Sequence, residues 1–291
     1  MELVRVNGKT TTEGFNAELN TLMQDVFGFS FARFQALGVW DEEYEYFSVC
    51  EAGRMIANCG VHHMQMLVEG QRLHYLQFGA VAVHPDYRGQ GLGRLVMESA
   101  LDAYPDVPSF LYANTDAVPF YEKLGFVTQE QRQPYVTVLP EPRHPGLERL
   151  EVIYPEVDAY LASRGSFSPH LDCLNQYALN WFHLVYMHQD HIYHVPALQA
   201  MLVMEEGAGE IVLHDVISQS PIAMDDLLPF VQSENVERIT FGFCPARLGC
   251  SYEGNPITSR GQRLWCGDAP RSAASYPGWC ARERRLSGET V

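Results

Sequence analysis

The stretch VHPDYRGQGLGRL, residues 83–95, combines residue types that suit the binding of a phosphate or pyrophosphate group. It contains three glycines, which keep side chains away from an approaching ligand, and two arginines, which add positive charge: Arg88, Gly89, Gly91, Gly93 and Arg94. It lies between a strand-like run and a helix-like run. The first N–H groups of a helix have no internal acceptor and carry the positive end of the helix dipole, which favours an anion. The sequence therefore predicts a pyrophosphate-binding turn.

Two common phosphate motifs do not fit this turn. No Lys-Ser or Lys-Thr pair follows the glycines, as a P-loop requires, and Arg94 stands where the dinucleotide fingerprint has a glycine. Nucleotide hydrolysis and hydride transfer therefore both lose support.

The elements that position the turn follow from hydrophobic periodicity in the first half of the chain. We expect strands at 3–6, 46–50, 54–68, 73–83, 109–113 and 135–138, and helices at 15–26, 31–37, 91–104 and 117–126. Gly70 permits a tight hairpin between the two long strands. The order is mixed α+β, with the helices packed on a mostly antiparallel sheet.

The motif Arg88-Gly89-Gln90-Gly91-Leu92-Gly93 resembles the Arg/Gln-x-x-Gly-x-Gly/Ala pattern of the GNAT superfamily of acetyl-CoA-dependent N-acetyltransferases. VAVHPDY precedes it, and NTDAVPFYEKLGF (114–126) follows at the distance typical of that family. Two linked motifs at this spacing make the resemblance specific. It covers residues 1–140.

The resemblance implies that backbone groups of Val81 and Val83, on a splayed strand, hold the pantetheine arm and the thioester carbonyl of acetyl-CoA. It assigns the pyrophosphate to residues 88–94, namely Arg88, Gly89, Gln90, Gly91, Leu92, Gly93 and Arg94. Asn114 matches an asparagine that contacts the cofactor. Tyr121 matches the tyrosine near the sulfur, with a purely packing role as the alternative.

The implied reaction is direct attack of a neutral primary amine on the thioester through a tetrahedral intermediate. Tyr121 would protonate the leaving thiolate, and an N–H near Val83 would stabilise the oxyanion.

The general base stays open. Gln77 and Ser109 stand where many relatives carry a glutamate, and neither is a base near neutral pH. Water, His63, His74 and the acids of DEEYEY (Asp41, Glu42, Glu43 and Glu45) are the alternatives. The acidic stretch precedes a strand where relatives line the acceptor pocket, so we expect a cationic acceptor; a solvated helix end is the other interpretation.

The second half begins after a proline-rich linker at 141–150. We expect helices at 157–164, 171–186 and 224–231, and strands at 200–205, 210–217 and 238–243. The strand–strand–helix–strand order repeats the first half without its glycines and arginines. The sequence predicts a smaller α+β lobe, either a degenerate GNAT-like lobe or another accessory domain.

Histidine and cysteine patterns predict no metal. The histidines of HLVYMHQDHIYH (183–194) lack an H-E-x-x-H spacing, and no C-x-x-C occurs near the end of the chain. The residues concerned are His183, His188, His191, His194, Cys244, Cys250, Cys266 and Cys280.

Composition limits the partners. The formal charge of −16 argues against a general nucleic-acid binder, and the hydrophobic content of 46% supports a globular fold. With no apparent leader or apolar span, and an odd number of seven cysteines, the sequence favours the cytoplasm and reduced thiols.

The sequence thus predicts a two-domain acyltransferase that acetylates a small-molecule or peptide amine. We expect a GNAT domain at 1–140, a linker at 141–150, a second lobe at 151–246 and an irregular basic tail at 247–291. A non-catalytic acyl-CoA sensor is the alternative function, because the usual glutamates are missing. Another donor, such as succinyl-CoA, also stays open.

Overall fold

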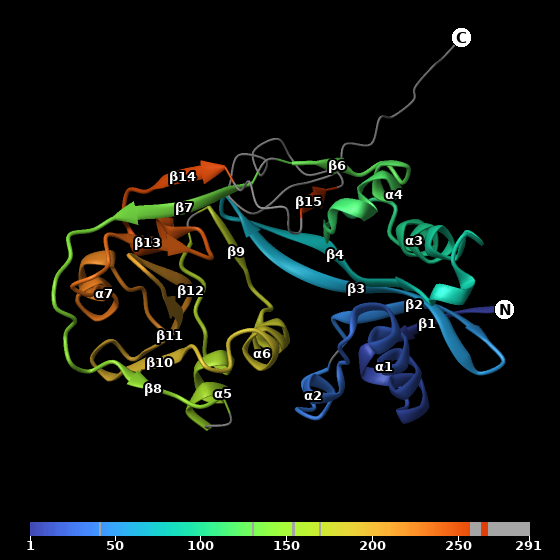
Figure 1. Ribbon diagram of the computed structural model, residues 1–291, viewed down its shortest axis with the longest axis horizontal. Helices are drawn as coiled ribbons and strands as arrows, with labels where there is room; N and C mark the ends of the chain where they lie inside the picture. The colour runs from blue at the N-terminus through green and yellow to red at the C-terminus, as the bar shows by residue number, and fades with distance from the viewer. Residues whose placement is uncertain (41, 130, 153–154, 169, 257–262, 267–291) are drawn as a thin grey trace, which may run out of the picture.

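The computed structural model describes residues 1–40, 42–129, 131–152, 155–168, 170–256 and 263–266, and only the backbone of the last range. The chain forms two lobes, each built around one sheet (Figure 1). Within these residues, no helix is both long and apolar enough to cross a membrane.

The first sheet has the strand order β1-β2-β3-β4-β5-β15-β6, and β9 pairs with β3 beside this path. Its strands are β1 (Glu2–Asn7), β2 (Tyr44–Glu51), β3 (Arg54–Val68), β4 (Gln71–Val83), β5 (Ser109–Ala113), β6 (Val127–Thr128), β9 (Leu171–Cys173) and β15 (Arg263–Cys266). All pairs are antiparallel except β4 with β5.

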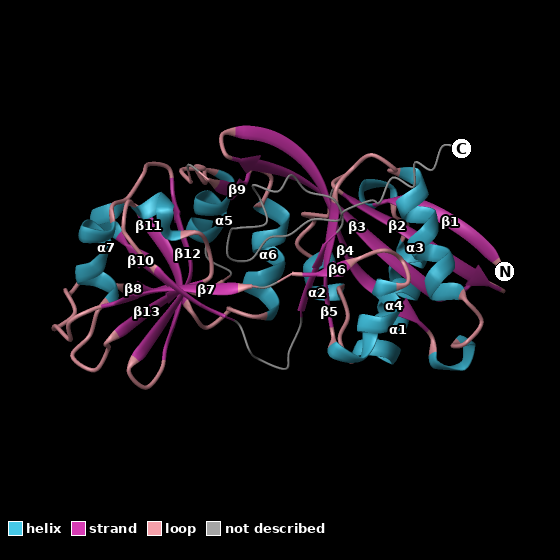
Figure 2. Cartoon of the chain, turned by 90° about the horizontal axis from the view of Figure 1, so that it is seen from above, coloured by secondary structure: helices cyan, strands magenta, loops and turns pink. Residues whose placement is uncertain are grey.

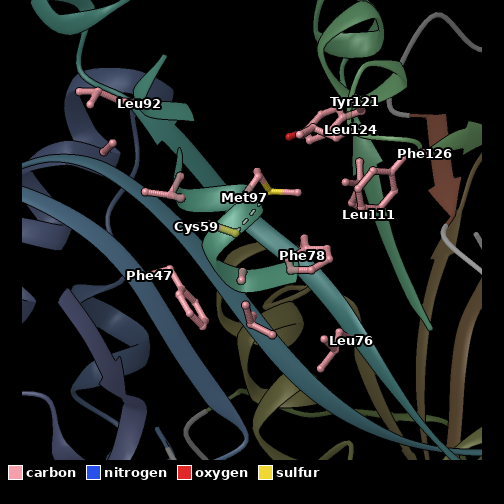
Figure 3. Packing of buried hydrophobic residues seen from close by; sticks show 14 of the residues in the cluster. Phe47, Cys59, Leu76, Phe78, Leu92, Met97, Leu111, Tyr121, Leu124 and Phe126 are labelled. Atoms are coloured by element: carbon pink, nitrogen blue, oxygen red, sulfur yellow. Dashed lines mark hydrogen bonds between the residues drawn. The ribbon is translucent and has the colours of Figure 1, made fainter. Parts of the chain in front are cut away.

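Helices cover both faces of this sheet (Figure 1). On one face lie α1 (Glu13–Phe27) and α2 (Ala32–Gln35), and on the other α3 (Leu92–Ala103) and α4 (Val118–Glu122). The apolar side of α3 explains its position, since its residues at helical spacing pack on the strands (Figure 3). The residues drawn include Leu92, Met97, Phe47, Cys59 and Phe78.

The second sheet has the order β14-β7-β13-β12-β11-β10-β8. Its strands are β7 (Arg132–Thr137), β8 (Glu148–Arg149), β10 (Ile192–Val195), β11 (Ala200–Glu206), β12 (Glu210–Ser218), β13 (Arg238–Phe241) and β14 (Glu253–Pro256). Its helices are α5 (Pro155–Ala162), α6 (Tyr177–Tyr186) and α7 (Met224–Val231). Short 3₁₀ turns occupy Gly8–Thr10, Pro85–Tyr87, Thr115–Ala117, Pro196–Leu198 and Pro245–Leu248. In both overall views α6 lies between the two sheets (Figures 1 and 2).

The two lobes share one order of elements. In the first, the β3–β4 hairpin leads through α3 to β5, parallel to β4. In the second, the β11–β12 hairpin leads through α7 to β13, parallel to β12. The α+β fold class predicted from the sequence is confirmed.

Three segments differ from expectation. The helix expected at 171–186 begins only at Tyr177, because Leu171–Cys173 forms strand β9 and pairs with β3. The strand expected at 135–138 is β7, but it pairs with β13 and β14 in the second sheet, and Val136 packs in the second core. Periodicity indicates a strand but not its partner. In the expected irregular tail, β14 pairs with β7 and β15 with β5 and β6, while 257–262 and 267–291 lie outside the described residues. We therefore propose that the lobe boundary falls between β6 and β7.

Candidate functional site

The parallel strands β4 and β5 separate in the middle of the first sheet. They are paired only from Leu76 with Ser109 to Phe78 with Leu111. Strand β4 then continues through Gly79–Val83 without β5 beside it. This arrangement leaves a backbone edge of β4 open to a ligand, and it matches the splayed strand expected for Val81 and Val83.

A bulge turns the open part of β4. Asn58 is opposite Ala82 and Gly60 is opposite Gly79, so Ala80 and Val81 together face one residue of β3. Ala80 has a φ of +50°. The fully buried Asn58 side chain donates from Nδ2 to the Ala80 carbonyl at 3.0 Å and accepts from Ser48 Oγ at 2.8 Å. Asn58 therefore holds the bulge, a role that no sequence motif indicated.

The glycine turn lies at the N-terminus of α3, as predicted. Gly89 and Gly91 have φ values of +78° and +80°, in the left-handed region that favours glycine. The first N–H groups of α3 have no intrahelical acceptor, as at every helix N-terminus. Because the N-cap Gly91 has no side chain to accept from them, they also lack a capping bond. These groups belong to Leu92, Gly93 and Arg94.

The flanking arginines are exposed and each makes a local contact. Arg88 donates from Nε to the Val83 carbonyl at 3.4 Å, and Arg94 donates from Nε to Glu98 Oε1 at 2.8 Å. An incoming pyrophosphate would find both side chains beside the turn, with Arg94 partly compensated by Glu98.

A cavity of about 830 Å³ lies between the lobes, a size typical of ligand sites. From the first lobe it is lined by Phe27, Phe29, Met64, Gln77, Phe78, Gly79, Ala80, Val81, Phe110, Tyr112, Ala113, Asn114, Ala117 and Tyr121. The cavity thus brings together three predicted site residues: Val81, Asn114 and Tyr121. Val83 and the turn at 88–94 are not part of this wall.

Tyr121 on α4 lies at this wall and is 7% exposed. Its ring packs on Phe120 and Phe126, with centroid distances of 5.0 and 6.1 Å, and in Figure 3 its hydroxyl points away from Phe126. Burial raises the pKa of the phenol above its usual value. The hydroxyl therefore stays protonated at neutral pH, and the same shift makes it a weaker acid than an exposed phenol.

The described side chains considered as bases from the sequence do not line this cavity: His63, His74, Glu42, Glu43 and Glu45. His63 Nδ1 lies 3.0 Å from His74 Nε2, burial lowers the pKa of both imidazoles, and neither lines the wall. Within the acidic stretch, Glu45 bonds Arg5 Nε at 2.6 Å and Glu42 bonds Lys9 Nζ at 3.0 Å. Asp41 lies outside the described residues.

The second lobe contributes a charged cluster that sequence reasoning missed. Arg247 Nη2 donates to Asp215 Oδ1 at 2.6 Å and to the Val216 carbonyl at 2.7 Å. Arg164 also donates to Asp215, and its Nη2 lies 3.8 Å from Asp172 Oδ1. Burial alone would raise the pKa of Asp215, but the two guanidinium groups lower it to about 2. All four side chains line the cavity.

The rest of this wall is mostly apolar or neutral. It comprises Leu171, Cys173, Gln176, Leu179, Asn180, Phe182, His183, Leu184, Met187, His188, Val203, His214, Ile217, Gly242, Phe243 and Cys244. Burial lowers the pKa of His183 to about 4, so its imidazole is neutral at pH 7.

Sequence comparisons agree with the geometry of the first lobe. Residues 42–128 match the family model described as an acetyltransferase (GNAT) domain. The peptidyl-lysine N-acetyltransferase YjaB of Salmonella typhimurium is 39% identical over 62 residues, which is 21% of this chain and 39% of that protein. The uncharacterized N-acetyltransferase ycf52 of Gracilaria tenuistipitata var. liui is 41% identical over 51 residues, 16% of this chain and 28% of that protein. The matched parts thus span well under half of these relatives.

Solved structures resemble both lobes. A conserved protein from Enterococcus faecalis V583 matches with a TM-score of 0.58 and 15% identity, over 91% of this chain and 72% of that chain. Eis1 from Mycobacterium abscessus matches with a TM-score of 0.55 and 11% identity, over 91% of this chain and 73% of that chain. A GCN5-related N-acetyltransferase from Kribbella flavida matches with a TM-score of 0.53 and 18% identity, over 91% of this chain and 70% of that chain. At these identities the likeness concerns the fold alone.

Proposed function

Because the chain belongs to the GNAT acetyltransferase superfamily, we propose that its first lobe transfers an acetyl group from acetyl-CoA to a primary amine. The observation that carries this proposal is the position of one cavity between the open edge of β4, the buried hydroxyl of Tyr121 and the wall of the second lobe. A thioester laid along β4 would meet an amine entering from that wall.

The first lobe fits coenzyme A in two places. The N–H groups of Leu92, Gly93 and Arg94 suit the pyrophosphate, because Gly89 and Gly91 leave the approach open. The edge of Gly79–Val83 beyond the last β5 pair suits the amide groups of pantetheine. Asn114 supplies a further polar group at the cavity.

The second lobe does not fit a second coenzyme A. Asp225 and Asp226 occupy the first turn of α7, where their carboxylates would repel a phosphate. Past the last pair of β12 with β13, Arg247 bonds the Val216 carbonyl on β12. We therefore propose that the second lobe is a degenerate, noncatalytic GNAT-like lobe whose role is to complete the acceptor site.

Tyr121 is the proton donor in this proposal. The Tyr121 phenol keeps its proton at neutral pH, so it can donate a hydrogen bond to the sulfur as negative charge develops there. The departing thiol has a pKa of about 8.5 and the buried phenol is the weaker acid, so in this proposal Tyr121 passes its proton to the thiolate and is reprotonated from solvent. Both wall carboxylates, Asp172 and Asp215, lie beside arginines. We therefore assign removal of the amine proton to water in the cavity.

The acceptor site is close to electrically neutral. Arg164 and Arg247 face Asp172 and Asp215, and the surrounding wall is rich in aromatic and aliphatic side chains. The wall therefore favours a small-molecule or peptide amine attached to an apolar group. The cationic acceptor suggested by residues 41–46 loses support, because the described acids of that stretch do not line the cavity.

A cytoplasmic site of action is part of the proposal. The described cysteines Cys50, Cys59, Cys173, Cys244 and Cys250 are free thiols, in keeping with a reducing compartment. The acidic net charge of −16 does not favour nucleic acid as a partner.

The test is thiol release from acetyl-CoA, and separately from succinyl-CoA, with a panel of amines that includes aromatic amines, polyamines and lysine peptides. We expect turnover with acetyl-CoA, and a loss of about 10²-fold or more in kcat for Tyr121→Phe with unchanged acetyl-CoA affinity. Tyr112→Phe, a second tyrosine at the wall, is the matched control and should keep its rate. Acetyl-CoA binding in calorimetry without thiol release for any amine would support the sensor function instead.

A further inference from the structure

Three side chains that commonly bind metals converge in the second lobe. His188 follows α6, Glu205 lies on β11 and His214 lies on the neighbouring strand β12. One potential ligand atom from each lies within 4.8 Å of the other two. The three residues come from separate elements, so the fold brings them to one point.

The distances suit a shared ion. Glu205 Oε1 lies 3.0 Å from His214 Nε2 and 3.3 Å from His188 Nδ1. When a metal has bonds of about 2.0–2.2 Å, its neighbouring ligand atoms are roughly 3.0–3.5 Å apart. A carboxylate oxygen and two imidazole nitrogens could therefore take adjacent coordination positions with small adjustments.

The ligand atoms face one another rather than solvent. His188 Nδ1 is buried, and it points to Glu205 Oε1 at 3.3 Å.

The cluster is reachable from the interlobe cavity. His188 and His214 both line its wall, so an ion can enter from solvent there. Asp215 is next to His214 in sequence but is already bonded to Arg164 and Arg247. The three-residue set therefore remains distinct from the arginine cluster.

We propose that His188, Glu205 and His214 bind one first-row divalent metal ion, with Zn²⁺ as the probe. Two imidazoles and one carboxylate form a ligand set that such ions favour, and three protein ligands leave a coordination position for water or for a polar group of the acceptor. The sequence did not indicate this set, because only His188 belongs to the histidine-rich stretch at 183–194.

The experiment uses the full chain after treatment with a chelator, and it does not depend on acetyl transfer. Zn²⁺ is titrated by calorimetry, and Co²⁺ is followed by its visible absorption. We expect one ion per chain and at least ~10-fold weaker binding in His188→Asn, Glu205→Gln and His214→Asn. His194→Asn and Glu206→Gln are the matched controls and should bind as the parent protein does.

Thermal unfolding provides a second readout that does not require the variants to be equally stable. Zn²⁺ should raise the melting temperature of the parent protein and of both controls, but not that of Glu205→Gln. The proposal is overturned if the parent protein shows no saturable binding, or if the three ligand variants bind the ion as tightly as the parent protein does. Tyr121→Phe should still bind the ion, so a failure of the proposed transferase function would be seen separately.

Discussion

Replacing Asn58 by alanine should weaken both the fold and the cofactor site. The Asn58 amide donates to the Ala80 carbonyl, and its oxygen accepts from Ser48. Alanine removes both bonds. Ser48 and Asn58 are fully buried, whereas the Ala80 carbonyl belongs to a residue at the cavity, where water can replace the lost donor.

The magnitude follows from these environments. An unsatisfied buried hydroxyl costs about 1–3 kcal/mol, and a carbonyl that water can reach costs less, so we expect a total loss of about 2–4 kcal/mol. Ala80 has a left-handed φ of +50°. A strained backbone of this kind costs of order 1–3 kcal/mol and persists only where its surroundings hold it. Without the Asn58 donor the bulge should relax, and acetyl-CoA affinity should fall by about 10-fold, or ~1.4 kcal/mol.

Urea unfolding measures the first effect and calorimetry with acetyl-CoA measures the second. Ser48→Ala is the control, because it removes the hydroxyl but keeps the bond from Asn58 to the Ala80 carbonyl. It should lower stability by about 1–2 kcal/mol and leave acetyl-CoA affinity unchanged. Normal cofactor affinity in Asn58→Ala, or an equal loss in Ser48→Ala, would refute the role assigned to the bulge.

Three further predictions concern the turn, the charged cluster and the proton donor. Gly91→Ala should lower stability by about 1 kcal/mol and acetyl-CoA affinity by at least ~10-fold. The control Gly209→Ala, at a φ of +78° between β11 and β12 of the second lobe, should show only the stability loss. Equal cofactor affinity in the two variants would contradict the pyrophosphate site. Arg247→Met should lower the free energy of unfolding in urea by about 3–5 kcal/mol, because it leaves buried charges unpaired. The exposed Arg94→Met is the control, and an equally small loss of stability in both variants would disprove the prediction. The pKa of Tyr121 is raised and the donor acts when protonated, so titration of this group should not lower kcat until above about pH 10. If kcat instead declines near pH 8 and Tyr121→Phe abolishes that decline, the phenol is not the buried acid described.

The local geometry of the residues proposed to bind the cofactor could be predicted because these residues are close in sequence. The turn at 88–94 needs only a strand before it and a helix after it, and the left-handed backbone of Gly89 and Gly91 follows from local chemistry. Tyr121 could be placed in the same way, from a short helix next to β5. The splay of β4 from β5 was expected from family resemblance and is present in the strand pairing.

The residues of the proposed acceptor site could not be brought together from the sequence, because pairing between distant segments places them. Arg164, Asp215 and Arg247 are separated by tens of residues, and none belongs to a recognisable motif. Their proximity depends on the order of the second sheet, in which β7, from the segment expected in the first domain, pairs with β13. Hydrophobic alternation is the same for a strand in either sheet, so the sequence could not indicate which sheet β7 would join.

Strand β9 has a consequence for how a substrate enters. It belongs to the second half of the chain, yet Met66, Leu67 and Val68 of β3 pair with Cys173, Asp172 and Leu171. Asn175 extends this junction by donating from Nδ2 to the His63 carbonyl at 2.8 Å. A motion that separated the lobes would have to break these backbone bonds or bend the short segments that join β9 to α5 and α6. We therefore expect substrates to enter the proposed site with little change in its width.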